Sequence, residues 1–161
     1  MVENEKEAII SARDFIFHDH DYKFYLTGSR YFGGATESSD FDFFIQDSDE
    51  VARDLLHHGF ELLPSYSHDG SGEKRLARDE DIVRVMRFQD TTIEGKPFQI
   101  DVQLVMDVKR RVDIIKWAKY SELIPKLDKK DRPDFWNLLR QIYLSGPGPK
   151  KKSWWRGHDG R

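Results

Sequence analysis

Apolar residues recur along this chain with two periods, one typical of helices and one typical of strands. Ile9, Ala12 and Ile16 lie on one face of a helix that we predict over residues 5–17. Over residues 98–106 apolar and polar residues alternate instead, which predicts a half-buried strand. Because both periods occur in one chain, the pattern predicts a domain that combines helices with a sheet.

The remaining elements follow from the same periods together with turn and cap residues. Ser48 is a candidate N-cap for one helix, and Gly59 is the residue that would end it. A Glu-Gly-Lys turn signal at residues 94–96 predicts that the strands on either side of it pair in antiparallel fashion. The predicted strands cover residues 23–27, 40–45, 60–66 and 82–88, and the further predicted helices cover residues 49–58, 107–120 and 133–144.

Length and composition bound the number of domains. With 161 residues, of which 38% are hydrophobic, the chain can bury one core but not two. We therefore expect an α/β (α+β) fold in which a mixed, mostly antiparallel sheet is flanked by helices, in a single domain over residues 1–145. Residues 146–161 are expected to form a flexible tail, which is basic and contains Trp154 and Trp155.

The sequence also bears on the compartment. No apolar run approaches the roughly 18 residues needed to span a bilayer, and the charged residues 2–7 do not resemble a signal peptide. The chain contains no Cys, which excludes a disulfide framework. We expect a cytoplasmic location and no membrane partner.

Asp40 and Asp42 are the first candidates for chemistry. They are two positions apart on a predicted strand, so their side chains share one face and lie about 6.6 Å apart along it. Two carboxylates about 4 Å apart repel by roughly 4 kcal/mol at an effective dielectric of about 20, so such a pair needs a counter-charge. Because the chain offers oxygen ligands and no thiolate, the expected metal is Mg²⁺, with Mn²⁺ as a substitute.

Gly28 and Ser29 lie where the first predicted strand ends and the chain turns. Backbone N–H groups and a hydroxyl at such a turn can meet a phosphate. Arg30 follows directly and is a further candidate for a phosphate contact, although Glu37 or Asp40 could equally be its partner. We expect Gly28, Ser29 and Arg30 to contribute to phosphate binding.

A third acid is expected at Asp101, on the polar face of the predicted strand over residues 98–106. Asp107 and Asp113 follow nearby, and only the phase of the strand selects Asp101. Asp107 begins a helical stretch, so we interpret it as an N-cap. If the sheet orders its strands accordingly, Asp101 lies beside the first acidic pair.

The combined pattern resembles the nucleotidyltransferase superfamily that includes DNA polymerase beta. It consists of an apolar-Gly-Ser turn, a gap, an Asp-apolar-Asp-apolar strand and a later strand Asp. The run from Gly28 to Asp42 is similar to the signature of minimal nucleotidyltransferases, which include the antitoxin partners of toxin–antitoxin pairs. The resemblance covers roughly residues 22–106.

This resemblance implies roles for the candidate residues. Ser29 would contact the nucleotide phosphates. Asp40 and Asp42 would bind two metal ions, and Asp101 would complete the metal site and help to activate the acceptor hydroxyl. All three acids would therefore be both metal-binding and catalytic.

Basic residues gather after the third predicted strand. Lys74 is the candidate contact to the outer phosphate oxygens, where a cation stabilises charge that moves to the leaving pyrophosphate. The alternative is that the loop charges are simply solvated. The other members of this basic group are Arg75, Arg78, Arg84 and Arg87.

The tail over residues 146–161 combines Lys and Arg with two adjacent Trp residues. Cations next to rings that can stack suit single-stranded nucleic acid. The alternatives are a disordered terminus and a Trp pair that packs back on the domain.

The expected function is the metal-dependent transfer of a nucleoside monophosphate from an NTP, with ATP as the first choice, to an acceptor hydroxyl. A protein is the first choice of acceptor, and a small molecule or an RNA end are the alternatives. The competing class is a non-catalytic module that keeps the fold and sequesters a protein or nucleic-acid partner.

Overall fold

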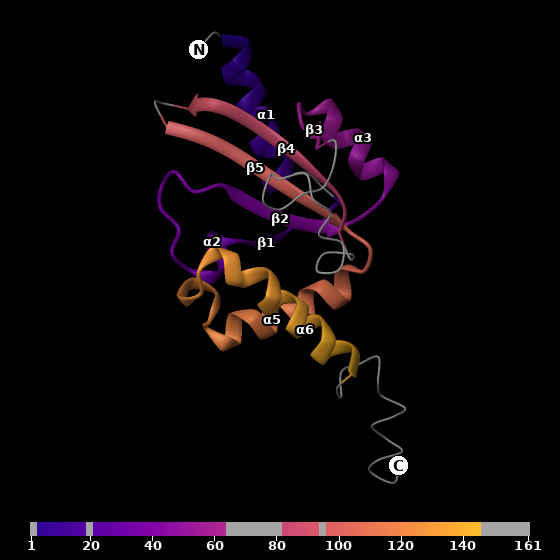
Figure 1. Cartoon of the computed structure of the whole chain (residues 1–161). Helices are drawn as coiled ribbons and strands as arrows, with labels where there is room; N and C mark the ends of the chain where they lie inside the picture. Colours follow the sequence, from indigo (N-terminus) through magenta and orange to yellow (C-terminus); the bar gives the residue numbers. More distant parts are fainter. Residues whose placement is uncertain (1–2, 19–20, 64–81, 94–95, 146–161) are drawn as a thin grey trace.

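A computed structural model of the chain describes residues 3–18, 21–63, 82–93 and 96–145. This described part contains five α-helices, two short 3-10 helices and a five-stranded sheet (Figure 1). The α-helices are α1 (Glu3–His18), α2 (Ser29–Phe32), α3 (Asp49–His57), α5 (Val108–Ser121) and α6 (Arg132–Ser145). The strands are β1 (Tyr25–Thr27), β2 (Phe41–Gln46), β3 (Glu61–Leu62), β4 (Ile82–Ile93) and β5 (Lys96–Val105).

The sheet has the strand order β1-β2-β5-β4-β3. Only β2 and β5 are parallel among these neighbours, and the other pairs, including the predicted pair β4–β5, are antiparallel. The predicted fold class, a mixed and mostly antiparallel sheet flanked by helices, is therefore confirmed. Most bounds differ from the prediction by one or two residues, and the largest difference is that β4 continues to Ile93. Within the described residues β3 covers only Glu61–Leu62, and residues 64–66 of the predicted strand lie outside the description.

Two helices begin at the caps that the sequence predicts. The Ser48 hydroxyl accepts a hydrogen bond from the Val51 N–H at 3.1 Å, at the start of α3. The Asp107 carboxylate accepts one from the Arg110 N–H at 3.2 Å, at the start of α5. Each cap satisfies a backbone donor that the first helical turn leaves without a partner. Asp107 is thus a structural residue, as its interpretation as an N-cap requires.

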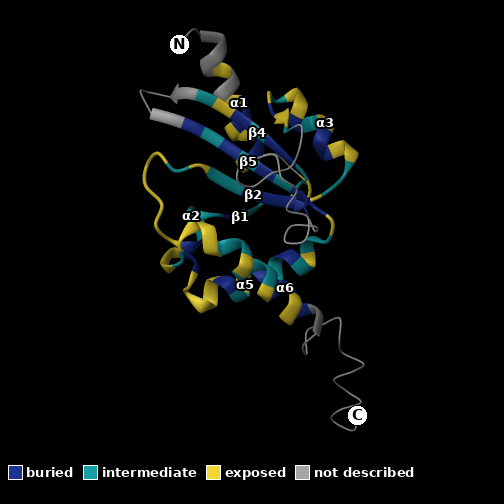
Figure 2. Ribbon diagram, viewed as in Figure 1, coloured by how far each residue is buried: buried dark blue, intermediate teal, exposed yellow. Residues whose placement is uncertain are grey.

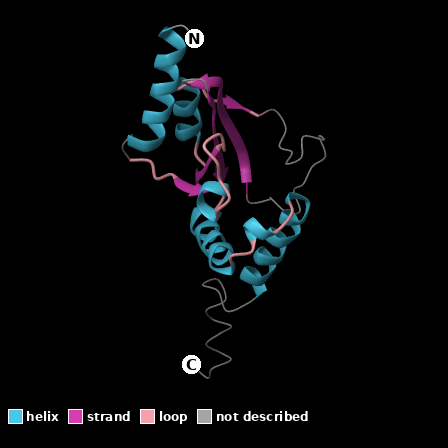
Figure 3. Ribbon diagram, turned by 90° about the vertical axis from the view of Figure 1, so that its left-hand side faces the viewer, coloured by secondary structure: helices cyan, strands magenta, loops and turns pink. Residues whose placement is uncertain are grey.

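The sheet separates two hydrophobic cores, because successive side chains of a strand point to opposite faces. On one face, alternate residues of β2 and β5 such as Phe43 and Val102 pack with α1 and α3. On the other face, Phe44 and Val105 pack with α2, α5 and α6. Figure 2 shows buried residues running along the central strands, and Figure 3 shows the strands between the two groups of helices. The central strands are therefore covered on both faces.

Several predictions fall outside this description. Lys74 and its loop, and the basic tail with its Trp pair, belong to residues 64–81 and 146–161, which the structure does not describe. These predictions stay predictions, as does the single domain over residues 1–145. None of the helices in the described ranges is long and apolar enough to cross a membrane.

Candidate active site

The parallel pair β2–β5 brings two of the predicted acids together. Asp42 on β2 is the direct register partner of Asp101 on β5. Asp40 lies one residue before β2, on the same side of the chain as Asp42. Both strand acids share a face with Phe44, which is the face that α2, α5 and α6 cover farther along the sheet. The structure therefore gathers the three predicted acids around the start of β2, beside the middle of β5.

Gly28 lies directly against Asp42. It is the N-cap of α2 and has a φ of 71°, in the left-handed region that favours glycine. A Cβ atom added to Gly28 would lie 2.2 Å from Oδ2 of Asp42 and 2.9 Å from its Cβ atom. Only glycine fits this position, because both the backbone conformation and the contact with Asp42 exclude a side chain. Ser29, the next residue, begins α2 and is half-buried.

Gln99 connects two of the acids. Its side-chain amide donates hydrogen bonds to Oδ2 of Asp40 at 3.0 Å and to Oδ2 of Asp101 at 3.2 Å. It comes from β5, two residues before Asp101 and on the same strand face. We did not predict a role for Gln99, although the alternation that selects Asp101 also places Gln99 on the polar face.

Arg87 on β4 forms a two-pronged ion pair with Asp101. The Nε and Nη2 atoms of Arg87 donate to Oδ1 and Oδ2 of Asp101 at 2.8 and 3.1 Å. The two residues are register partners on adjacent antiparallel strands, so the backbone fixes this pairing. The hydrogen bonds to Asp101 raise the pKa of Arg87 above its ordinary value. The sequence places Arg87 in a basic group but does not indicate its partner.

Arg84, another member of that basic group, has a different role. Its Nε atom donates to Asp47 at 2.7 Å and its Nη2 atom donates to Asp49 at 3.0 Å. These partners lie between β2 and α3 and at the start of α3, away from the three acids. The structure thus separates two arginines of one strand that the sequence places together.

Arg30 holds the segment that leads into β2. Its Nη2 atom donates to the carbonyl oxygen of Ser39 at 2.7 Å and also reaches the carbonyl oxygens of Thr36 and Glu37. The guanidinium carbon lies 4.0 Å from the centre of the Phe41 ring. Arg30 therefore positions the chain just before Asp40. Its predicted contact with a nucleotide phosphate stays a prediction.

Burial and like charges act on the acids in the same direction. The pKa of Asp42 is raised to about 7, first by burial and then by the charges of Asp101 and Asp40. The pKa of Asp40 is also raised, by desolvation and by Asp101, while Arg87 and Lys129 act in the opposite direction. When they are ionised, the carboxylates of Asp40, Asp42 and Asp101 repel one another, and a bound cation would reduce this repulsion.

The donor chemistry of the site fits Mg²⁺ or Mn²⁺, because the candidate ligands are carboxylate oxygens. Within the described ranges, however, no three acidic or His side chains are already arranged around a common metal position. Both oxygens of Asp101 accept hydrogen bonds from Arg87, and Asp40 accepts one from Gln99. Two of the three acids are thus bonded to protein donors.

The comparisons with known proteins add no relative. No protein-family model matches the chain, and no curated protein or solved structure matches it either. The resemblance to nucleotidyltransferases therefore depends on the motif residues themselves.

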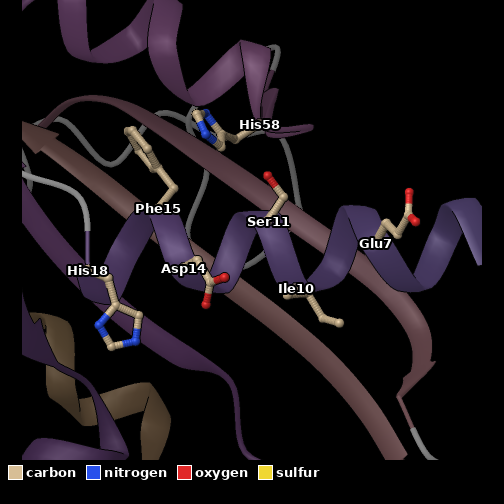
Figure 4. Close-up of a pocket in the computed structure, with 7 residues that line it drawn as sticks. All are labelled: Glu7, Ile10, Ser11, Asp14, Phe15, His18 and His58. Carbon is tan, nitrogen blue, oxygen red and sulfur yellow. The ribbon is translucent and has the colours of Figure 1, made fainter.

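A hollow with a volume of about 380 Å³ lies beside α1, which packs on the face of the sheet opposite to the strand acids (Figure 4). The His58 ring stacks on Phe15 with a centroid distance of 4.2 Å, and Figure 4 shows His18 pointing to a different side of α1 from His58. The polar groups around this hollow do not converge on one point, so it offers no catalytic arrangement. Its lining residues are Glu7, Ile10, Ser11, Asp14, Phe15, His18 and His58.

Proposed function

We propose that this chain is a metal-dependent nucleotidyltransferase. It transfers a nucleoside monophosphate from an NTP, with ATP as the first choice, to an acceptor hydroxyl and releases pyrophosphate. The observation that carries the proposal is the pairing of Asp42 with Asp101 on adjacent strands, with Asp40 linked to Asp101 through Gln99. Two carboxylates on adjacent strands and a third directly before β2, beside the turn at Gly28, suit chemistry that depends on positioning and charge.

Asp40, Asp42 and Asp101 would hold the metal ions. When bound there, Mg²⁺ or Mn²⁺ lowers the pKa of the acceptor hydroxyl and neutralises charge on the triphosphate. Asp101 orients the acceptor hydroxyl and takes its proton as the oxygen attacks the α-phosphorus. The bond from the α-phosphorus to its bridging oxygen breaks, and pyrophosphate leaves with the electron pair. The glycine at position 28 lets the turn lie directly against Asp42, so that Ser29, the proposed phosphate contact, is the next residue along the chain.

A protein hydroxyl is the proposed acceptor, because the run from Gly28 to Asp42 is most similar to the minimal nucleotidyltransferases that include antitoxins. A small-molecule hydroxyl and an RNA end are the other outcomes that the following experiment separates.

The test is to incubate the purified chain with each of the four α-³²P-labelled NTPs, Mg²⁺ or Mn²⁺, and cell lysate as the source of acceptors. The inactive comparison is the double variant Asp40→Asn/Asp42→Asn. The matched control is Asp49→Asn, because Asp49 is an exposed acid whose carboxylate pairs with Arg84 outside the site. Label should appear on a protein fraction with the wild type and with Asp49→Asn but not with the double variant.

Equal labelling by the wild type and the double variant would contradict the proposal. Co-purification of a stoichiometric partner, without label under any condition, would favour the non-catalytic binding module instead.

A further inference from the structure

The contacts of Asp101 suggest how the site admits its metal. Arg87 occupies both oxygens of this carboxylate, and the amide of Gln99 donates to both at 3.3 and 3.2 Å. An ionised carboxylate offers about four lone-pair positions, so these donors use most of its capacity. A metal ion that binds Asp101 must therefore displace protein donors that the β4–β5 register holds in place.

We propose that Arg87 competes with the metal ion for Asp101, so that the site loads metal efficiently only together with a triphosphate, to which Arg87 transfers its hydrogen bonds. This inference rests on the proposed function and names the regulation of that same site. It assigns Arg87 a positioning role, because Arg87 acts on the metal through Asp101.

The chemistry of Arg87 favours such an exchange. A guanidinium donates a fork of N–H groups that matches the oxygens of a phosphate as well as those of a carboxylate. The Arg87 side chain is 36% exposed, whereas Asp101 is 15% exposed, so Arg87 can reach an anion that arrives from solvent. A fixed positive charge beside Asp101 also opposes a free divalent cation. A triphosphate removes both obstacles, because it carries its own metal and offers Arg87 new acceptors.

The same strand supplies a matched control. Arg84 lies three positions before Arg87 on β4 and also forms an ion pair with carboxylates, those of Asp47 and Asp49. Arg84→Gln therefore removes one positive charge and two ion pairs from the same strand without touching the three acids. A difference between Arg87→Gln and Arg84→Gln reports the contact with Asp101 and not the net charge.

The experiment measures binding of Mn²⁺ alone by electron paramagnetic resonance to the wild type, Arg87→Gln and Arg84→Gln. Arg87→Gln should bind Mn²⁺ about tenfold more tightly than the wild type, and Arg84→Gln should bind like the wild type. Calorimetric titration with inorganic triphosphate in excess Mg²⁺ should show the opposite order, with an affinity about tenfold weaker in Arg87→Gln. Inorganic triphosphate is used because it makes the result independent of the nucleotide base.

Weaker Mn²⁺ binding by Arg87→Gln would overturn the inference, because it would mean that Arg87 orients Asp101 for the metal. An affinity for Mn²⁺ equal to that of the wild type would also overturn it. If Arg87→Gln does not fold, Arg87→Lys replaces it, since lysine keeps the charge but cannot form the fork. Arg87→Lys should then show a smaller gain in Mn²⁺ affinity, and a loss would again overturn the inference.

These outcomes are distinguishable from failure of the proposed function. If the wild type binds metal and transfers label, and only the predicted gain in Arg87→Gln is missing, this inference alone fails. If neither variant nor the wild type binds Mn²⁺, with or without triphosphate, both proposals fail.

Discussion

The two faces of the central strands β2 and β5 differ sharply although they share one backbone. On the α1 and α3 face, Ile100 and Val102 are fully buried and Phe43 is 5% exposed, so the face is apolar along its length. On the opposite face, Asp42 lies near the start of β2 and Asp101 in the middle of β5, and the buried residues Phe44 and Val105 follow only farther along. Because strand neighbours point to opposite faces, a shift of one position separates a packing residue from a candidate catalytic one.

The packing of the apolar face fixes the backbone that carries the acids of the other face. Side chains packed on one face of a strand fix its backbone, and the residues on the other face are then held in a defined geometry. The acids contribute no comparable stabilisation, because burial and mutual repulsion raise the pKa of Asp42 to about 7. One face therefore stabilises the sheet, and the other face places mutually repelling charges on it.

The largest expected effect on stability comes from opening a cavity in the apolar face. Ile100→Ala removes a side chain that is 0% exposed, and it should lower the free energy of unfolding by about 2–5 kcal/mol. Urea denaturation followed by circular dichroism measures this. The comparison is Asp101→Asn, one position along the strand, which should lower the free energy of unfolding by less than Ile100→Ala, because weaker repulsion of Asp42 offsets part of the lost ion pair with Arg87. If Ile100→Ala matched the wild type, the assignment of this face to the core would be wrong.

The next effect concerns the turn beside Asp42. Gly28→Ala should lower the free energy of unfolding by about 1–3 kcal/mol and reduce nucleotide transfer, because its Cβ atom would overlap the Asp42 carboxylate. Gly34→Ala is the control, since Gly34 also has a positive φ, of 90°, but its added Cβ would meet no atom within 4 Å. Thermal unfolding and initial rates measure both variants. If Gly28→Ala and Gly34→Ala lost equal stability and activity, the effect would come from backbone strain alone and not from the overlap with Asp42.

The pH dependence of stability tests the repulsion on the acidic face. The ordinary pKa of Asp42 is 3.8 and its folded value is about 7, so between these values only the folded chain holds the proton. The contribution to stability is therefore complete below about pH 4 and is lost as the pH rises through about 7. Asp42→Asn should be more stable than the wild type at pH 8 by on the order of 2 kcal/mol, a figure discounted for the remaining solvent contact of Asp42.

This gain should vanish near pH 4, and added Mg²⁺ should raise the melting temperature of the wild type at pH 8 more than that of the variant. A stability difference that does not change between pH 4 and pH 8 would contradict the raised pKa.

The smallest expected effect comes from the ion pairs of Arg84 with Asp47 and Asp49, which lie away from the three acids. Arg84→Gln should lower the free energy of unfolding by only about 0.2–1 kcal/mol, because the Arg84 side chain is partly exposed and Asp49 is almost fully exposed. A double-mutant cycle with Asp47→Asn measures the coupling. Transfer rates should be unchanged, and a large loss of rate would show that the site extends to this end of β4.

Local signals made much of this structure predictable. The strand phase that selects Asp101, and the caps at Ser48 and Asp107, depend on residues close in sequence. The partner of Arg87 was not predictable in the same way, because it is set by the register of β4 on β5. Likewise, nothing near Arg30 in the sequence indicates that its donors turn to the carbonyl groups of the following segment. Side-chain partners are decided by tertiary geometry, whereas the elements that carry them are decided locally.

The parallel pairing of β2 with β5 also sets an order of assembly. Parallel neighbours need a long connection, and here Asp40 and Gln99, which contact each other, are 59 positions apart. During synthesis from the N-terminus, the turn at Gly28 and strand β2 leave the ribosome well before β5 does. A nascent chain that has formed only its first two strands therefore carries the acidic pair without Asp101, Gln99 or Arg87. The three candidate acids therefore come together only late in biosynthesis, when β5 enters the sheet.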